Sequence, residues 1–105
     1  YVDGKIGAAG STGRGEAVII AVGSHTVVEA MRAGMHPTDA ALLGIRRVVE
    51  MNTMPYLWKE GKPTFQVHFY AVDVKGRVGG ASIRPSSYAC ADAKGPRFAD
   101  TAYLE

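Results

Sequence analysis

Three glycines surround two hydroxyl side chains near the start of the chain, in the stretch "AAGSTGRGEAV" (residues 8 to 18). Glycine lets a backbone turn sharply or approach another group closely. Thr12 is expected to end a strand with its hydroxyl toward a cleft, and the N–H of Gly13 would point out beside it. Two such donors at the start of a helix suit the oxyanion that forms when an amide carbonyl is attacked. The alternative is a strand-to-helix turn in which the glycines only relieve crowding.

The same glycines do not predict a nucleotide site. A P-loop requires G-x-x-x-x-G-K-[ST], but Gly15 is followed by Glu16 and Ala17. The dinucleotide fingerprint has its glycines in the opposite order, and a parallel strand follows its helix. Here a second helix is expected instead. Glu16 would also repel a phosphate at the helix start.

Two helices are expected to follow the glycine stretch. The first spans about Gly15 to Ala33, with Gly34 as its C-terminal cap. The second starts near Pro37, because proline is favoured at the first helical position. A short strand precedes them at Val2 to Ser11, with Asp3-Gly4 as a turn. Because strand side chains alternate, Ser11 would face away from Thr12.

The rest of the chain predicts β structure after a connection from Asn52 to Pro63. Dense β-branched and aromatic residues and tight-turn signals indicate two hairpins. Their expected strands are Gln66 to Val74, Arg77 to Arg84, Ser87 to Ala93 and Arg97 to Tyr103. The predicted order is one strand, two helices and about four strands, a mixed α/β class.

The totals fit a single segment, residues 1 to 105. Hydrophobic residues make up 47% and charged residues 21%, and the net charge is +2. This is a globular composition that predicts no nucleic-acid partner, and no apolar run predicts a membrane span. The chain opens on Tyr1 without a recognisable signal peptide, which indicates a processed product, a fragment or a trimmed end. Leu104-Glu105 could be a vector scar. Most elements look apolar on more than one side, so the segment is expected to pack against further polypeptide.

Other reactive side chains do not predict a second site. The three histidines, His25, His36 and His68, lack metal-ligand spacing, so no metal is expected. We expect His25 to be a packed imidazole and His68 to be a strand residue. The single Cys90 excludes an intrachain disulfide and is expected to be a small buried hydrophobe. Hydrophobic packing is the favoured role over a sugar platform for three scattered aromatics, Tyr56, Trp58 and Tyr70.

The glycine motif lies in a longer sequence pattern. This pattern consists of "VDGKIGAAGSTGRGEAVI", then "VGSHTVVEAMRAGMHPTDAA", and later the predicted hairpin "QVHFYAVDVKGRVGGASI". It resembles the later part of the β-subunit of the glycosylasparaginase family, which belongs to the N-terminal-nucleophile hydrolases. The collinear match covers most of residues 1 to 51. Plant-type asparaginases share a similar Thr-Gly-x-Gly-Glu stretch. The helix text with His25, Glu29 and Met31 looks closer to the glycosylasparaginase branch.

The resemblance implies part of a four-layer αββα sandwich and assigns roles residue by residue. Thr12 and Gly13 would contact the substrate and form the oxyanion hole. Arg14, which departs from the smaller or imidazole-bearing residue common there, would be a weaker substrate contact. The nucleophile, a threonine exposed by self-cleavage, would lie upstream of Tyr1. So would the arginine and aspartate that hold the substrate's α-groups. The family implies no cofactor.

The function implied by the resemblance is an amidohydrolase component that cleaves the side-chain amide of N-glycosylated asparagine, giving aspartate and a glycosylamine. Its partners would be the α-subunit and the N-terminal part of the β-subunit, in an αβ hetero-oligomer or a dimer of heterodimers. The location would be lysosomal or periplasmic. Two alternatives stay open: an isoaspartyl peptidase or L-asparaginase of the same family, and a non-catalytic binding or assembly module of that fold.

Overall fold

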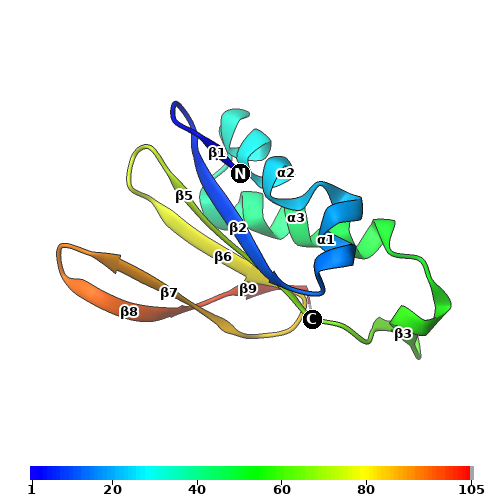
Figure 1. The fold of residues 1–105 in the computed structure, drawn as a ribbon. Coiled ribbons are helices and arrows are strands. Elements are labelled where there is room, and N and C mark those ends of the chain that lie inside the picture. The colour runs from blue at the N-terminus through cyan, green and yellow to red at the C-terminus, as the bar shows by residue number, and fades with distance from the viewer. Residues whose placement is uncertain (105) are drawn as a thin grey trace.

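The chain forms a mixed α/β fold in which helices cover one face of a sheet and a hairpin extends from it (Figure 1). The computed structural model describes residues 1–104, so Glu105, the second residue of the suspected vector scar, lies outside the described residues. In chain order the elements are β1 (Val2–Asp3), β2 (Gly7–Gly13), α1 (Gly15–Ala21), α2 (Gly23–Arg32), α3 (Pro37–Met51), the 3-10 turn η1 (Pro55–Leu57), β3 (Trp58–Lys59), β4 (Lys62–Pro63), β5 (Val67–Asp73), β6 (Val78–Ser82), β7 (Ser87–Asp92), β8 (Gly95–Asp100) and β9 (Ala102–Tyr103).

The main sheet has the strand order β1-β2-β5-β6-β9. β2 pairs antiparallel with β5 along its whole length, so Thr12 lies opposite His68 and Gly13 opposite Val67. β5 pairs antiparallel with β6, whereas β9 pairs with β6 in parallel. The pairs β3–β4 and β7–β8 are separate from this sheet. The register therefore brings the end of the glycine stretch beside the start of β5.

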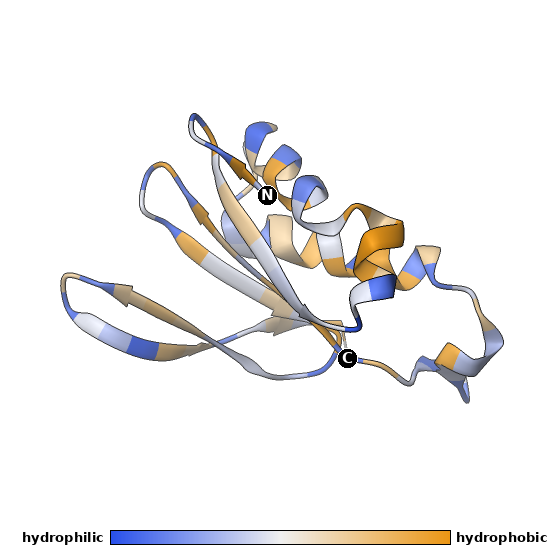
Figure 2. Cartoon of the chain, viewed as in Figure 1, coloured by the Kyte–Doolittle hydropathy of each residue, from blue (hydrophilic) through white to orange (hydrophobic). Residues whose placement is uncertain are grey.

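The core lies between the main sheet and the helices. α2 and α3 pack on each other, and α3 also lies against β5 and β6. Phe69 from β5, Ile45 from α3 and Val27 from α2 are fully buried there. Figure 2 shows strongly apolar residues in α1 as well, but Ile19 and Ile20 of this helix are exposed and lie outside the core. Because alternate residues of a strand face opposite sides, only one face of each strand joins this core.

The opposite face of the main sheet, here called the outer face, is open over much of its area. It carries Ala8, Gly10 and Thr12 of β2 and, beside them, His68, Tyr70 and Val72 of β5. Tyr70 and Val72 are each 40% exposed. The β7–β8 hairpin diverges from this face (Figure 1). The sequence prediction that elements are apolar on more than one side matches this exposed face.

The helix predicted over residues 15–33 is wrong at one point, because Val22 separates α1 from α2. Val22 has φ 51° and ψ 50°, a left-handed conformation that is unfavourable for a β-branched residue. Neighbouring side chains satisfy the carbonyls that the break exposes. Thr26 Oγ1 donates to the carbonyls of Ala21 and Val22 at 3.1 and 3.0 Å. Arg47 Nε, from α3, also donates to the Ala21 carbonyl at 3.1 Å.

Both ends of the β pattern also differ from the prediction. The segment predicted as one strand from Val2 to Ser11 is a hairpin of β1 and β2, and β2 continues to Gly13. The last predicted strand divides at Thr101: β8 stays in the hairpin, and β9 joins the main sheet beside β6. The helix expected near Pro37 is confirmed as α3. Within residues 1–104, no helix combines the length and apolarity needed to cross a bilayer.

Candidate active site

Thr12 and Ser11 lie on opposite sides of β2, as the alternation of strand side chains predicts. Ser11 is half-buried and pairs with Phe69, which is fully buried under the helices. Thr12 is exposed and lies with His68 on the outer face. The hydroxyl of Thr12, and not that of Ser11, is therefore free to meet a molecule on this face.

The N–H of Gly13 points toward the open edge of β2. The N–H of Ala9 donates to the carbonyl of Tyr1 at 3.0 Å, so it points away from β5. Because N–H directions alternate along an antiparallel strand, the N–H groups of Ser11 and Gly13 point to the same side. Within residues 1–104, no strand pairs with β2 on that side beyond Ala9. A backbone donor at the edge thus lies next to the Thr12 hydroxyl on the outer face.

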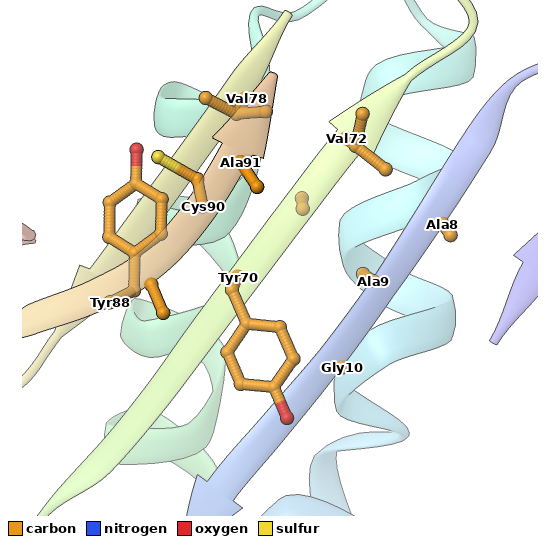
Figure 3. A pocket seen from close by; sticks show the side chains of 11 residues that line it. Ala8, Ala9, Gly10, Tyr70, Val72, Val78, Tyr88, Cys90 and Ala91 are labelled. Carbon is orange, nitrogen blue, oxygen red and sulfur yellow. The ribbon is translucent and has the colours of Figure 1, made fainter. Parts of the chain in front are cut away.

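Two of the three motif glycines have a structural reason of their own. Gly13 has φ 119°, and a Cβ there would lie 2.3 Å from the carbonyl oxygen of Gln66. A Cβ at Gly10 would lie 2.6 Å from the ring of Tyr70, which reaches from β5 toward Gly10 (Figure 3). Gly15 has no neighbour within 4 Å of such an atom. Crowding therefore explains why Gly10 and Gly13 are glycines. It does not account for the direction of the Gly13 N–H, which is inferred from the hydrogen bond of Ala9.

Gln66 holds the corner at which β2 ends. Its backbone carbonyl accepts from the N–H of Arg14 at 3.3 Å. Its side-chain Oε1 accepts from the N–H groups of Ile83 and Arg84 at 2.9 and 3.1 Å, and its Nε2 donates to the Arg84 carbonyl at 3.1 Å. One residue thus ties the end of β2 to the end of β6. The sequence interpretation did not single it out.

A pocket of about 290 Å³ opens beside Thr12 on the outer face. Its walls come from β2, β5 and β7, and the lining residues are Thr12, His68, Tyr70, Ser87, Tyr88 and Ala89. Burial raises the pKa of the Tyr88 phenol, and the nearby Cys90 thiol adds to the rise. That phenol stays neutral at ordinary pH and keeps its hydroxyl proton. The corner of β2 therefore borders a pocket with aromatic walls and several hydroxyl groups.

His68 is held in this pocket by a chain of hydroxyl groups. Its Nε2 lies 2.7 Å from Oγ of Ser86. Ser86 is fixed in turn by Thr101, whose Oγ1 accepts from the Ser86 N–H and donates to the Ser86 carbonyl, both at 3.1 Å. Thr101 and Ser82 are both buried, and Thr101 Oγ1 lies 2.6 Å from Ser82 Oγ. Such support fixes the imidazole before any ligand binds. The strand position expected of His68 is confirmed, but its pocket was not predicted.

Arg14 lies just past this corner. It precedes α1 as its N-terminal cap residue, and its guanidinium carbon lies 5.6 Å from the centroid of the Tyr56 ring. A cation at this distance from an aromatic face is attracted by the ring. Arg14 is not among the residues that line the pocket beside Thr12. The helix that it caps has only seven residues, so the long helix expected at this position is absent.

Three other sequence expectations are wrong. Tyr56 and Tyr70 are 66% and 40% exposed, so packing does not bury them, whereas Trp58 packs against the core as expected. The side chain of His25, expected to be packed, is 48% exposed and makes an edge contact with the Tyr1 ring at 4.8 Å. Cys90 is half-buried on the hairpin, where it lines two apolar grooves. The β7–β8 hairpin therefore has a groove on each side of Cys90. The alanines that flank Cys90 in the sequence had indicated a buried position instead.

Ionic contacts lie away from the corner. Arg77 Nε pairs with Asp73 Oδ2 at 2.6 Å in the turn between β5 and β6. Arg32 pairs with Asp3 and Glu29 near β1. Across residues 1–104, no group of three or more His, Cys, Asp or Glu side chains is arranged to hold a metal ion. The chemistry that the corner offers is hydrogen bonding by neutral donors.

Comparison with known proteins identifies relatives for most of the chain. It is 39% identical over 101 residues to the N(4)-(β-N-acetylglucosaminyl)-L-asparaginase of Elizabethkingia miricola, an alignment that covers 93% of this chain and 28% of that protein. The chain is a homologue of the glycosylasparaginases. The resemblance seen in the sequence is thereby confirmed.

A Drosophila yakuba protein provisionally given the same glycosylasparaginase name is 37% identical over 81 residues, which cover 77% of this chain and 18% of that protein. A Drosophila persimilis protein so named is 46% identical over 48 residues, 46% of this chain and 12% of that protein. The matches lie in the C-terminal portion of these proteins. The chain spans less than a third of the length of these glycosylasparaginase relatives. No protein-family model matches it.

Proposed function

We propose that this chain is the C-terminal part of an amidohydrolase that cleaves the side-chain amide of N-glycosylated asparagine. One observation carries the chemistry: the Thr12 hydroxyl and the Gly13 N–H lie at one corner of the sheet, on its outer face and its open edge. The names of the relatives supply the substrate class. Donors placed where negative charge develops lower the barrier to attack on a carbonyl.

In the proposed reaction, a threonine on another segment attacks the amide carbonyl, and Thr12 and Gly13 stabilise the oxyanion. The C–N bond then breaks, and the proton that the threonine hydroxyl lost is delivered to the nitrogen of the leaving glycosylamine. An ester between the substrate and the threonine remains. Water hydrolyses the ester, releasing aspartate and restoring the threonine hydroxyl. Arg14, next to Gly13, is proposed as a weaker substrate contact. No cofactor takes part in these steps.

The same proposal assigns the open faces of the segment to further polypeptide. An apolar groove of about 460 Å³ lies between the outer face and the β7–β8 hairpin, lined by small, aliphatic and aromatic residues that include Ala8, Val72 and Tyr88 (Figure 3). We propose that the α-subunit and the N-terminal part of the β-subunit cover this groove, toward the Ala8–Val72 end of the face, and leave the Thr12–His68 end open. They would thereby complete an αββα sandwich, in an αβ hetero-oligomer. By the same resemblance, the location would be lysosomal or periplasmic.

Substrate competition tests the function in the complete protein. Initial rates are compared for N-acetylglucosaminyl-asparagine, a β-aspartyl dipeptide and free asparagine, each at saturating and dilute concentrations. The highest kcat/KM is expected for the glycosyl-asparagine. If the dipeptide is preferred, the isoaspartyl peptidase alternative replaces this proposal. If no substrate is cleaved and no chain beginning with threonine co-purifies, the non-catalytic module replaces it.

A further inference from the structure

We propose that the pocket beside Thr12 is the subsite for the sugar of the leaving group, with His68 as its hydrogen-bonding residue. This inference rests on the proposed function and adds residues that the sequence motif does not include. The register of β2 and β5 places His68 directly across from Thr12, and both side chains line the same pocket. The proposal places in this space the group that is bonded to a carbonyl held at the corner.

The pocket has the composition that a sugar ring requires. A pyranose presents an apolar C–H face and a rim of hydroxyl groups, so it fits an aromatic wall flanked by polar side chains. Here Tyr70 and Tyr88 supply rings, and Ser87 supplies a hydroxyl. The volume of about 290 Å³ is near the lower end of ligand pockets, about 300–1,000 Å³. That size suits a single sugar ring better than an extended chain.

The ring of His68 is fixed but keeps one nitrogen for a ligand. Nε2 is engaged by Ser86 Oγ at 2.7 Å, and Ser86 is held by buried Thr101. The remaining nitrogen, Nδ1, accepts a hydrogen bond in one neutral tautomer and donates one in the other. A sugar hydroxyl both donates and accepts, so it can bind to either form. This adaptability favours a hydroxyl ligand over a purely anionic or cationic one.

The glycine stretch shapes the aromatic wall. Tyr70 reaches over β2 because Gly10 has no side chain, and a Cβ there would lie 2.6 Å from the ring. The Tyr70 hydroxyl lies 3.5 Å from the Ser11 carbonyl, at the limit of a hydrogen bond. The ring is thus kept beside Thr12 and does not stack on a neighbouring strand residue. One motif therefore forms both the oxyanion corner and one wall of the proposed sugar subsite.

The test compares two substrates that differ only in the sugar. In the complete protein, kcat/KM is measured for N-acetylglucosaminyl-asparagine and for free asparagine, with wild type, His68→Ala, Ser86→Ala, Arg14→Ala and His25→Ala. Losing one neutral hydrogen bond costs roughly 3- to 10-fold in binding. His68→Ala should lower kcat/KM for the glycosylated substrate by that factor and leave asparagine within about 2-fold. Ser86→Ala should show a smaller loss with the same selectivity.

His25→Ala, an exposed histidine on the helical side, is the matched control and should change neither substrate. Free N-acetylglucosamine, used as a competitive inhibitor, should bind less tightly to His68→Ala than to wild type. Equal losses on both substrates, no loss on either, or a sugar-selective loss in Arg14→Ala alone would overturn the subsite. If His68→Ala lowers the unfolding midpoint, the proposed subsite is judged by the substrate selectivity of Ser86→Ala and by the binding of free N-acetylglucosamine. A wild type that fails to cleave glycosyl-asparagine refutes the proposed function itself, which is a distinguishable result.

Discussion

The two faces of the main sheet are built from the same strands but serve different ends. On the helical face, Phe69 of β5 meets α2 and α3 and is fully buried. One residue on either side of it, His68 and Tyr70 face a pocket and open space. Side chains on the helical face are packed and exclude water, whereas polar and aromatic side chains on the outer face stay accessible to a ligand. In these strands, the alternation of side chains separates residues that pack in the core from residues that stay accessible to a ligand.

The largest expected effect is on the helical face. Phe69→Ala removes a fully buried ring and should lower the free energy of unfolding by about 3–5 kcal/mol. Urea unfolding of the complete protein measures it. Phe98→Ala, at a residue that is 80% exposed on the hairpin, is the matched control and should cost far less. Equal losses at the two positions would refute the distinction between a packed and an open side.

The next effect concerns catalysis on the outer face. Thr12→Val keeps the shape and removes one donor, so turnover in the complete protein should fall by about 10²–10³, with a smaller change in apparent substrate binding. Steady-state kinetics measure both quantities. Ser11→Ala, on the helical side of the same strand, should matter far less. Similar small losses at both residues would favour the structural turn over the oxyanion hole.

A third substitution tests whether further polypeptide covers the outer face. Val72 is 40% exposed in this chain, so a lysine at this position would be tolerated if the face stayed open. If the proposed partner segments cover it, Val72→Lys should destabilise the complete protein by about 2 kcal/mol or more, because a charge would be buried without a partner. Thermal or urea unfolding reports this. Val74→Lys, at a residue that is 61% exposed beside the turn, is the control, and equal small effects would leave the face open.

The smallest expected effect is a pH dependence at the far end of the same strands. Burial of Asp73 raises its pKa. Hydrogen bonds from the Arg77 side chain and from the N–H groups of Arg77 and Lys75 lower the pKa by more than burial raises it, so the net pKa is below the ordinary value. A carboxyl with a lowered folded pKa adds stability above its unfolded pKa. That stability is lost as the pH falls through the folded pKa.

Urea unfolding between neutral and strongly acidic pH measures this contribution. Asp73→Asn should flatten the acid limb and leave a less stable protein at neutral pH. A variant that loses stability equally at every pH would show that the carboxyl acts only through its shape. Asp39→Asn, an exposed carboxyl in the first turn of α3, is the matched control.

Local signals predicted much of this fold. Pro37 at the start of α3, the strand that became β5 and the opposite sides of Ser11 and Thr12 all follow from residue type and periodicity. The break at Val22 did not, because its support comes from Thr26 and from Arg47 on another helix. Long-range partners decide such features, and no window of sequence contains them.

The same contrast between local signals and long-range partners applies to the candidate site. Thr12 and Gly13 were found because a contiguous motif carries them, and their roles remain predictions. His68 was predicted only as a strand residue and Gln66 was not singled out, because their neighbours are distant in sequence: β2 for His68, and the end of β6 for Gln66. Applying the register of β2 against β5 to the sequence would have placed His68 beside Thr12.

The hydroxyl chain from Ser82 through Thr101 and Ser86 to His68 has a practical consequence for handling this protein. Thr101 lies just before β9, so any cleavage or fusion that displaces residues 101–103 would release Ser86. The imidazole would then lose its anchor although no residue of the pocket had been altered. If the pocket binds the sugar as proposed, the boundary chosen at this end in an expression experiment would change the preference between glycosylated and free asparagine.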